Sequence, residues 1–148
     1  MRLARYLAED HDRCDDLFER SQKEVLERRW DQAAASFAGF RKALERHLAM
    51  EEAVLFAAVE SARCGPIGPT QQMRVEHLDM RDLIDEMAEA AERRDADDFA
   101  GSAETLRVLM RQHNLKEEQV LYPMVERILG ADGARVLADM QRIEAPVG

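Results

Sequence analysis

The sequence predicts an all-α protein, an antiparallel up-and-down four-helix bundle with a short C-terminal fifth helix. The 148 residues are rich in Ala, Leu, Glu and Arg and contain only 5% aromatic residues, a composition typical of helical proteins. Apolar residues recur at helical spacing in four segments. Short polar or Pro/Gly-containing stretches separate these segments, and there is no long linker. We therefore expect a single domain over residues 1–148.

Each of the four segments has one face that we expect to be buried. The residues on these faces are Leu3, Leu7, His11, Cys14, Phe18 and Val25 in the first helix, Phe37, Phe40, Leu44, His47, Glu51 and Val54 in the second, Met73, His77, Met80, Ile84, Met87 and Ala91 in the third, and Phe99, Leu106, Met110, His113, Glu117, Val120 and Met124 in the fourth. All four histidines and two glutamates occupy faces that are normally apolar.

The breaks between the helices are visible in the composition. They are the stretches 28–32 (RRWDQ), 64–70 (CGPIGPT) and 93–98 (RRDADD). In the first and third, basic residues end one helix and an Asp at the start of the next provides an N-cap. Pro123 lies inside the fourth helix and should kink it. Gly130 should end that helix, and after a break at Gly133 the fifth helix should run from about Ala134 to Ile143.

Charge and composition exclude several classes of protein. The formal net charge of −9 argues against a basic surface for nucleic acid or anionic lipid. No stretch approaches the roughly 18 apolar residues of a membrane span, and the N-terminus has no apolar signal core. The two cysteines provide no disulfide framework, so we expect a reducing cytoplasm, with a reversible Cys14–Cys64 bond as the alternative.

A histidine-containing phrase occurs twice. HLAMEEAVLFAAVE starts at His47 and HNLKEEQVLYPMVE starts at His113, and half of their aligned positions are identical. The two histidines are 66 positions apart (113 − 47), and the same offset takes His11 to His77. We therefore predict two helix-pair repeats, over about residues 3–62 and 70–129, in which all four histidines and one glutamate per repeat stand in register.

The turns place these residues at one height in the bundle. In antiparallel helices, two residues lie side by side when they are equally distant from the turn. The midpoint of His11 and His47 is residue 29, that of His77 and His113 is residue 95, and that of Glu51 and His77 is residue 64, all within predicted turns. A glutamate four residues after a histidine shares its helix face, so both glutamates should join the same layer.

Four imidazoles and two carboxylates converging in a core indicate a metal site, since unpaired they would be costly to bury. The set is too large for one tetrahedral zinc and suits two metal ions bridged by carboxylates, with iron or manganese as the metal. The predicted ligands are His11, His47, Glu51, His77, His113 and Glu117. Glu52 and Glu118 remain alternatives to Glu51 and Glu117.

Other residues on these faces have both a packing and a functional interpretation. The eight methionines should fill the core, with Met73 and Met80 flanking the site. Cys14 is interpreted as a small core residue, and a redox role is the alternative. Tyr6 and Tyr122 are expected to pack in the core, although either could bring a hydroxyl near the metals.

The motifs resemble the hemerythrin-type HHE cation-binding domain. HLAMEEAVLF and HNLKEEQVLYP are similar to that family's two His-x-x-x-Glu-Glu helices, and the resemblance covers about residues 3–130. It implies a non-haem centre of two iron ions (Fe2+/Fe3+), oxo- or hydroxo-bridged, with manganese or zinc as substitutes. It also implies that Glu51 and Glu117 bridge the irons, that His11 and His47 bind one iron, and that His77 and His113 bind the other.

One departure from oxygen-carrying hemerythrins concerns Met73. Those proteins have a fifth histidine at this position, and their fourth-helix bridging carboxylate is an Asp at the position of Glu118. The four-His, two-Glu set looks more like HHE proteins linked to nitric-oxide and oxidative stress and to iron–sulfur cluster repair. The repair proteins usually carry an extra N-terminal cysteine-bearing domain, which is not seen in this sequence. Counting ligands leaves about one open position on each octahedral iron.

We therefore expect a cytoplasmic metal-binding protein that binds, senses or reacts with O2, NO or peroxide at a di-iron centre. Redox activity as an enzyme remains open. The alternative is iron storage or donation, or repair of iron–sulfur clusters under oxidative or nitrosative stress. The expected partner is a small diatomic or peroxide ligand, not a nucleic acid or a membrane, and no protein partner is identified.

Overall fold

The structure, a computed structural model, describes residues 1–144, which form helices joined by short turns and contain no strand. The elements are α1 (Leu3–Leu26), α2 (Trp30–Ala49), the π-helical segment η1 (Met50–Leu55), α3 (Phe56–Ala62), α4 (Gly68–Glu92), α5 (Ala96–Lys116), the π-helical segment η2 (Glu117–Leu121), α6 (Tyr122–Leu129), the 3-10 turn η3 (Gly130–Asp132) and α7 (Gly133–Gln141). The all-α prediction is confirmed, and α7 is the predicted fifth helix. The predicted domain end at residue 148 lies outside the described residues.

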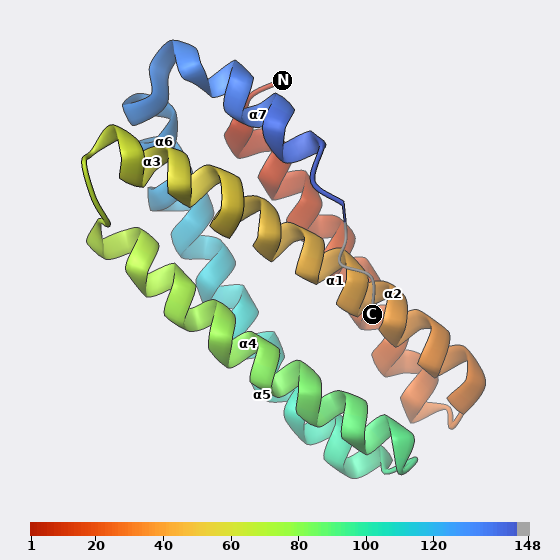
Figure 1. Cartoon of the computed structure of the whole chain (residues 1–148). Coiled ribbons are helices and arrows are strands. Elements are labelled where there is room, and N and C mark those ends of the chain that lie inside the picture. Colours follow the sequence, from red (N-terminus) through yellow and green to blue (C-terminus); the bar gives the residue numbers. More distant parts are fainter. Residues whose placement is uncertain (145–148) are drawn as a thin grey trace.

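The helices form an antiparallel up-and-down bundle, as predicted. α2, η1 and α3 follow one another as a continuous rod, as do α5, η2 and α6, and these rods alternate in direction with α1 and α4 (Figure 1). The α1–α2 and α4–α5 turns lie at one end of the bundle, and the α3–α4 loop lies at the other (Figure 1). α7 starts at that second end, runs back along the bundle and packs against η1 and α1 (Figure 1).

Both His-x-x-x-Glu-Glu helices contain a π-helical turn, and this changes which residues are buried. A π turn contains one more residue than the α-helical turn it replaces, so the buried face shifts along the sequence after it. For this reason Leu55 and Leu121 are buried, whereas the helical pattern had placed Val54 and Val120 there. Those two predictions are wrong: Val54 is only partly buried and Val120 is 56% exposed.

Pro123 lies in the first turn of α6, directly after η2. Its missing N–H therefore falls where the hydrogen-bonding pattern changes from π to α. The equivalent residue of the first repeat, 66 positions earlier, is Ala57, and η1 forms there without a proline. The π turn beside Pro123 therefore does not require the proline, and the predicted kink at Pro123 stays a prediction.

The turns between paired helices have equivalent conformations in the two repeats. Arg28 and Arg94 both adopt left-handed backbone angles, with φ of 60° and 54°. Asp95 caps α5, because its side chain accepts a hydrogen bond from the backbone N–H of Asp98 (3.0 Å). The predicted N-cap is therefore confirmed for α5 but is wrong for α2, where Asp31 lies inside the first turn. There its charge still favours the positive end of the helix dipole.

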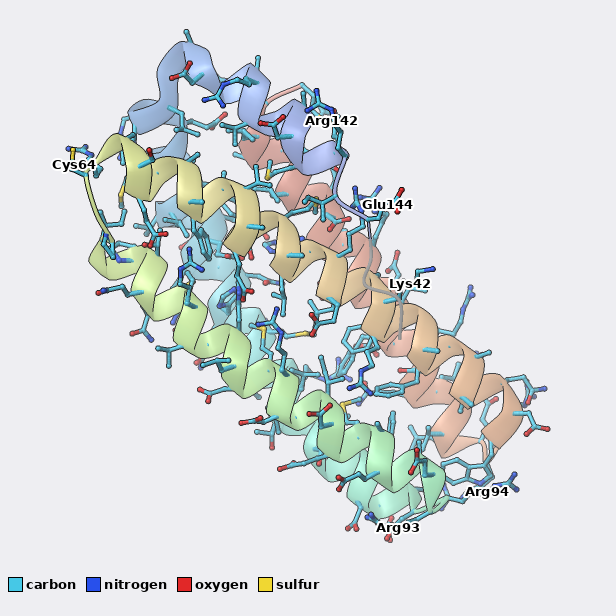
Figure 2. The ribbon with its side chains drawn as sticks, viewed as in Figure 1. Lys42, Cys64, Arg93, Arg94, Arg142 and Glu144 are labelled. Atoms are coloured by element: carbon cyan, nitrogen blue, oxygen red, sulfur yellow. The ribbon has the colours of Figure 1, made fainter. Side chains whose placement is uncertain are left out.

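The two cysteines are far from each other. Cys14 is buried in α1 at 3% exposure, whereas Cys64 is exposed on the α3–α4 loop at one end of the bundle (Figure 2). Both are free thiols, so the alternative of a Cys14–Cys64 disulfide is not realised in this structure. Burial raises the pKa of the Cys14 thiol well above its ordinary value, which agrees with its interpretation as a core residue.

A polar layer divides the buried apolar residues into two clusters. The cluster towards the α1–α2 and α4–α5 turns contains Phe18, Phe40, Ile84, Phe99 and Leu106, among others. The cluster towards α7 contains Leu7, Met50, Met73, Leu121 and Met140, among others. The buried histidines and acidic residues lie between these two clusters in each helix. Among residues 1–144 no helix has the length and apolar character that crossing a membrane requires.

We predict that Phe40→Ala destabilises the bundle without changing its site. The Phe40 side chain has no exposed surface, and its ring lies 5.1 Å from that of Phe18 and 6.3 Å from that of Phe37. Its removal should lower the free energy of unfolding by about 3–5 kcal/mol, measured by chemical denaturation. Leu26→Ala is the control, since Leu26 is 66% exposed and should change stability by about 0.5 kcal/mol or less. Equal effects of the two changes would contradict the placement of the core.

Candidate metal centre

The structure brings all six predicted ligands into one layer halfway along the bundle. Each long rod contributes a histidine, and the two π segments contribute the glutamates. The side chains are at most 5% exposed, and those of Glu51 and Glu117 have no exposed surface. This layer is far from the bundle ends, so it is held by the packing of all four rods.

Within the layer the donor atoms form two groups that share Glu117. One group contains Glu51, His77, His113 and Glu117, and the other contains His11, His47 and Glu117. In each group, one donor atom from every residue lies within 4.8 Å of the others. The ring centroids of His11 and His47 are 4.6 Å apart, and those of His77 and His113 are 5.0 Å apart. The geometry thus groups His11 with His47 and His77 with His113.

Several inner atoms of these residues point towards one another without forming hydrogen bonds. Five buried polar atoms in the described part of the chain have no hydrogen-bond partner: His47 Nε2, Glu51 Oε1, His77 Nε2, His113 Nε2 and Glu117 Oε2. Facing nitrogen and oxygen atoms lie only 3.2–3.5 Å apart, but their directions do not suit hydrogen bonds. Buried polar atoms are rarely left unpaired, and converging imidazole and carboxylate donors are what a metal ion requires. The residues present therefore fit a metal centre.

The outer nitrogen of every histidine in the layer donates a hydrogen bond to a carboxylate. His11 Nδ1 bonds Glu118 (2.7 Å), His47 Nδ1 bonds Asp10 (2.8 Å), His77 Nδ1 bonds Glu52 (2.7 Å) and His113 Nδ1 bonds Glu76 (2.9 Å). These bonds fix the orientation of each ring and leave Nε2 facing the layer. We call Asp10, Glu52, Glu76 and Glu118 the outer carboxylates.

This arrangement gives the two glutamates of each Glu-Glu pair different positions. The first of each pair, Glu51 or Glu117, lies inside the layer. The second, Glu52 or Glu118, instead reaches a histidine of another helix from outside. Sequence reasoning did not identify the remaining two outer carboxylates, Asp10 and Glu76. A signal was present, because both directly precede a histidine and they align under the 66-residue offset.

Comparison with known proteins agrees with the site. The sequence profile described as Hemerythrin HHE cation binding domain matches residues 2–125. The chain belongs to this family. Comparisons with curated proteins and with solved structures gave no match. The resemblance seen in the sequence is thereby confirmed, and family membership together with the buried His/Glu layer indicates metal binding.

Tyr122 makes the two halves of this HHE domain chemically different. Its single hydroxyl proton can be donated to Glu51 Oε2 (2.7 Å) or to Glu117 Oε1 (2.9 Å), and its oxygen lies 3.2 Å from His11 Nε2. The equivalent residue of the first repeat is Phe56. Each ring stacks on a histidine, Tyr122 on His11 and Phe56 on His77, with centroids 5.8 Å apart in both pairs. The two repeats therefore share a packing arrangement, but only one places a hydroxyl among the candidate ligands.

The other residues with two interpretations mostly pack in or against the core of the HHE domain, but the expectation that all eight methionines fill the core is wrong, because Met1 is 72% exposed. Tyr6 is outside the layer, because its hydroxyl accepts a hydrogen bond from Arg46 and contacts the sulfur of Met50. Met73 and Met80 are buried at 3% and 1% exposure, in the two different apolar clusters. Of the two tyrosines, only Tyr122 brings its hydroxyl to the site.

Buried ion pairs control the protonation of the histidines. Burial alone would lower the pKa of His11, but hydrogen bonds to Glu117 and Glu118 outweigh it and raise the pKa to about 10. Burial likewise opposes the charge on His77, but the nearby Glu51 carboxylate and the hydrogen bond to Glu52 outweigh it and raise its pKa to about 9. Both imidazoles are therefore cations at neutral pH in the metal-free protein.

We predict that metal binding to the metal-free HHE domain releases protons at pH 7. The folded pKa values of about 10 for His11 and about 9 for His77 lie above 7, and a metal ion can take Nε2 only after its proton has left. The apparent affinity should consequently rise as the pH increases from 7 towards 9. Calorimetric titration with Co2+ in two buffers of different ionisation enthalpy measures the number of protons. The variant His11→Ala should release fewer, and a heat independent of the buffer would contradict the prediction.

Proposed function

We propose that this HHE domain is a non-haem di-iron protein that binds, senses or reacts with O2, NO or peroxide. The observation that carries the proposal is the pair of donor groups that share Glu117, because a shared carboxylate suits two metal ions held close together. A mixed set of imidazole and carboxylate donors suits iron or manganese. Calcium prefers sites made entirely of oxygen donors, and softer metals prefer thiolates. Two irons in such a site would supply redox chemistry towards diatomic molecules and peroxide.

The outer carboxylates prepare the histidines for this role. Each accepts the Nδ1 proton of a ring, which fixes the tautomer and directs Nε2 inwards. Three of the four are themselves held by basic residues, Asp10 by Arg13, Glu52 by Arg81 and Glu76 by Lys116. Such supporting bonds typically change metal affinity by about 10–100-fold when they are lost.

Tyr122 and the two apolar clusters determine the polarity and hydrogen bonding around the proposed metal ions. Apolar residues above and below the layer exclude water, so polar interactions inside it are stronger than in solution. Burial raises the pKa of Tyr122, and the neighbouring Glu117 and Glu51 raise it further, so the phenol keeps its proton at Oη. This hydroxyl can donate a hydrogen bond to a ligand placed between Glu51 and His11.

Metal analysis tests the central claim. Protein from iron-supplemented cells should contain about two irons per chain, and its optical spectrum should contain near-ultraviolet bands of a bridged ferric pair. His47→Ala and His113→Ala should both lower the iron content, because each removes an inward Nε2. Asp10→Asn is the comparison variant and should lower the iron content less, since it keeps all six ligands and loses only the charge that orients His47. If His47→Ala and His113→Ala both keep two irons per chain, the ligand assignment is refuted.

Reaction with small molecules separates a sensor from an enzyme. Rapid mixing of the reduced protein with O2, NO or peroxide, followed by steady-state assays, should give either a stoichiometric complex or repeated turnover. Tyr122→Phe should alter the rate of this reaction while the iron content stays near that of the parent, because the phenol is not among the six proposed ligands. An unchanged rate would remove Tyr122 from the proposed chemistry.

Iron donation is the second candidate. It is favoured by one feature of the site, the partly exposed Glu118 (39% for its side chain), which contacts the candidate ligand His11. A donor should transfer its iron to an apo iron–sulfur protein, and His113→Ala should abolish the transfer. Retention of iron in the presence of such an acceptor would leave sensing or reaction as the function.

A further inference from the structure

The 66-residue offset relates two faces of the metal layer. One face lies between α2 and α4, outside His77, and the other lies between α1 and α5, outside His11. Each face contains the outer carboxylate that holds its histidine, Glu52 on the first and Glu118 on the second. If the repeats were chemically identical, both faces would be closed in the same way.

On the α2–α4 face, Arg81 closes the approach to the layer. Its Nη1 and Nη2 donate to the two oxygens of Glu52 (2.8 and 3.1 Å), and its Nε donates to Glu45 (3.0 Å). The guanidinium is only 28% exposed and covers Glu52 with a fixed positive charge. A metal cation approaching here would meet a like charge and a carboxylate whose oxygens are already bonded.

On the α1–α5 face, the charges at the equivalent positions are exchanged. Asp15 occupies the position of Arg81, and Arg111 occupies the position of Glu45. Within residues 1–144 neither of them forms an ion pair, and neither reaches Glu118. A short acidic side chain thus stands where the other face has a long basic one. The cavity on this face is lined by four carboxylates, Asp12, Asp15, Glu19 and Glu118, against two guanidinium groups, Arg107 and Arg111, so its lining is acidic overall.

A cavity of about 330 Å³ opens on this face. Its lining includes His11, Asp15, Phe18, Arg111, Asn114 and Glu118. His11 forms its inner end: Nδ1 bonds Glu118 on the cavity side, and Nε2 lies 3.0 Å from Glu117 inside the layer. On the opposite face, the residue equivalent to Asn114 is Leu48, which is buried at 1% exposure.

Glu118 also differs from the other three outer carboxylates in its freedom to move. Asp10, Glu52 and Glu76 are each held by a basic side chain. In the described part of the chain, Glu118 bonds only His11, and its side chain is 39% exposed. It can therefore swing away from the ring at the cost of a single hydrogen bond, while the other three are restrained by two or more bonds.

We infer that the α1–α5 face is the route by which a hydrated divalent cation enters and leaves the layer, with Glu118 as the movable carboxylate at its inner end. The inference rests on the proposed function, because it requires the layer to bind metal. Carboxylates attract the cation into the cavity and replace part of its water shell, and His11 with Glu118 lies between the cavity and the inner donors. Arg81 makes the α2–α4 face the closed side.

The test transfers the closed arrangement to the open face. The double change Asp15→Arg with Arg111→Glu recreates there the residues of the Arg81–Glu45 pair, without altering the net charge. Co2+ alone is the probe: binding to the metal-free full-length chain is followed by its visible bands, and release is followed after addition of EDTA. We expect uptake and release to slow together by about tenfold or more, with the equilibrium metal count unchanged. The matched control is the charge exchange Asp16→Arg with Arg20→Glu, since both residues are exposed on α1 outside the cavity, and it should exchange Co2+ at the parent rate.

Two further variants keep the test decisive. Asn114→Leu introduces the residue found at the equivalent position of the closed face, Leu48, and should also slow Co2+ exchange. This variant tests the route if the double variant does not fold. Arg81→Ala removes the guanidinium from the closed face and should add a second route, raising the rate of uptake. Parent rates in both α1–α5 variants would overturn the inference while leaving metal binding intact. If the parent itself binds neither Co2+ nor Fe2+, the proposed function fails and the route fails with it.

Discussion

The burial of Glu51 and Glu117 is the constraint on which the rest of the structure depends. Both carboxylates have no exposed surface and lie in the middle of the bundle, where an unpaired charge costs several kcal/mol. Burial would raise the pKa of Glu117, but the neighbouring His11 and His113 outweigh it and hold the pKa well below its ordinary value. The four imidazoles and the Tyr122 hydroxyl are therefore needed at this height. The outer carboxylates in turn hold the imidazoles, so a network of acids and bases extends from the centre to the surface.

The helices and the six-residue layer could be predicted because both depend on the spacing of residues along the sequence. Buried apolar residues follow the helical period, and the equal distances of His11, His47, His77 and His113 from the turns set one common height. The error at Val54 and Val120 has a physical cause. The prediction assumed a uniform α-helical period, whereas each π turn adds one residue and rotates everything after it.

Side-chain contacts between helices were harder to predict than the height of each residue along its helix. Asp10 and Glu76 were visible as aligned acidic residues. An acidic residue on a helix is usually exposed to solvent. The helical spacing of apolar residues does not show that such a residue faces a histidine of the neighbouring helix. Tyr122 was expected to pack, and it does stack on His11. Its polar contacts with the glutamates follow from the register after the π turn, which the pattern did not contain.

The two repeats have chemically equivalent residues in the metal layer but different residues at the positions around it. The histidines, the inner glutamates and the outer carboxylates correspond one to one. The pairs Phe56 and Tyr122, and Arg81 and Asp15, do not match in chemistry. Because the layer itself is nearly symmetric, differences between its two halves arise from these few positions.

The division of the apolar core has a consequence for the cooperativity of folding. Two separate clusters, one around Phe40 and one around Met140, lie on opposite sides of the polar layer. In the metal-free chain, either end of the bundle can open locally while the other stays packed. A metal ion bound in the layer would join chain positions as distant as 11 and 117, acting as a cross-link that restricts the unfolded chain. Amide hydrogens at the two ends would then exchange through one common opening instead of two.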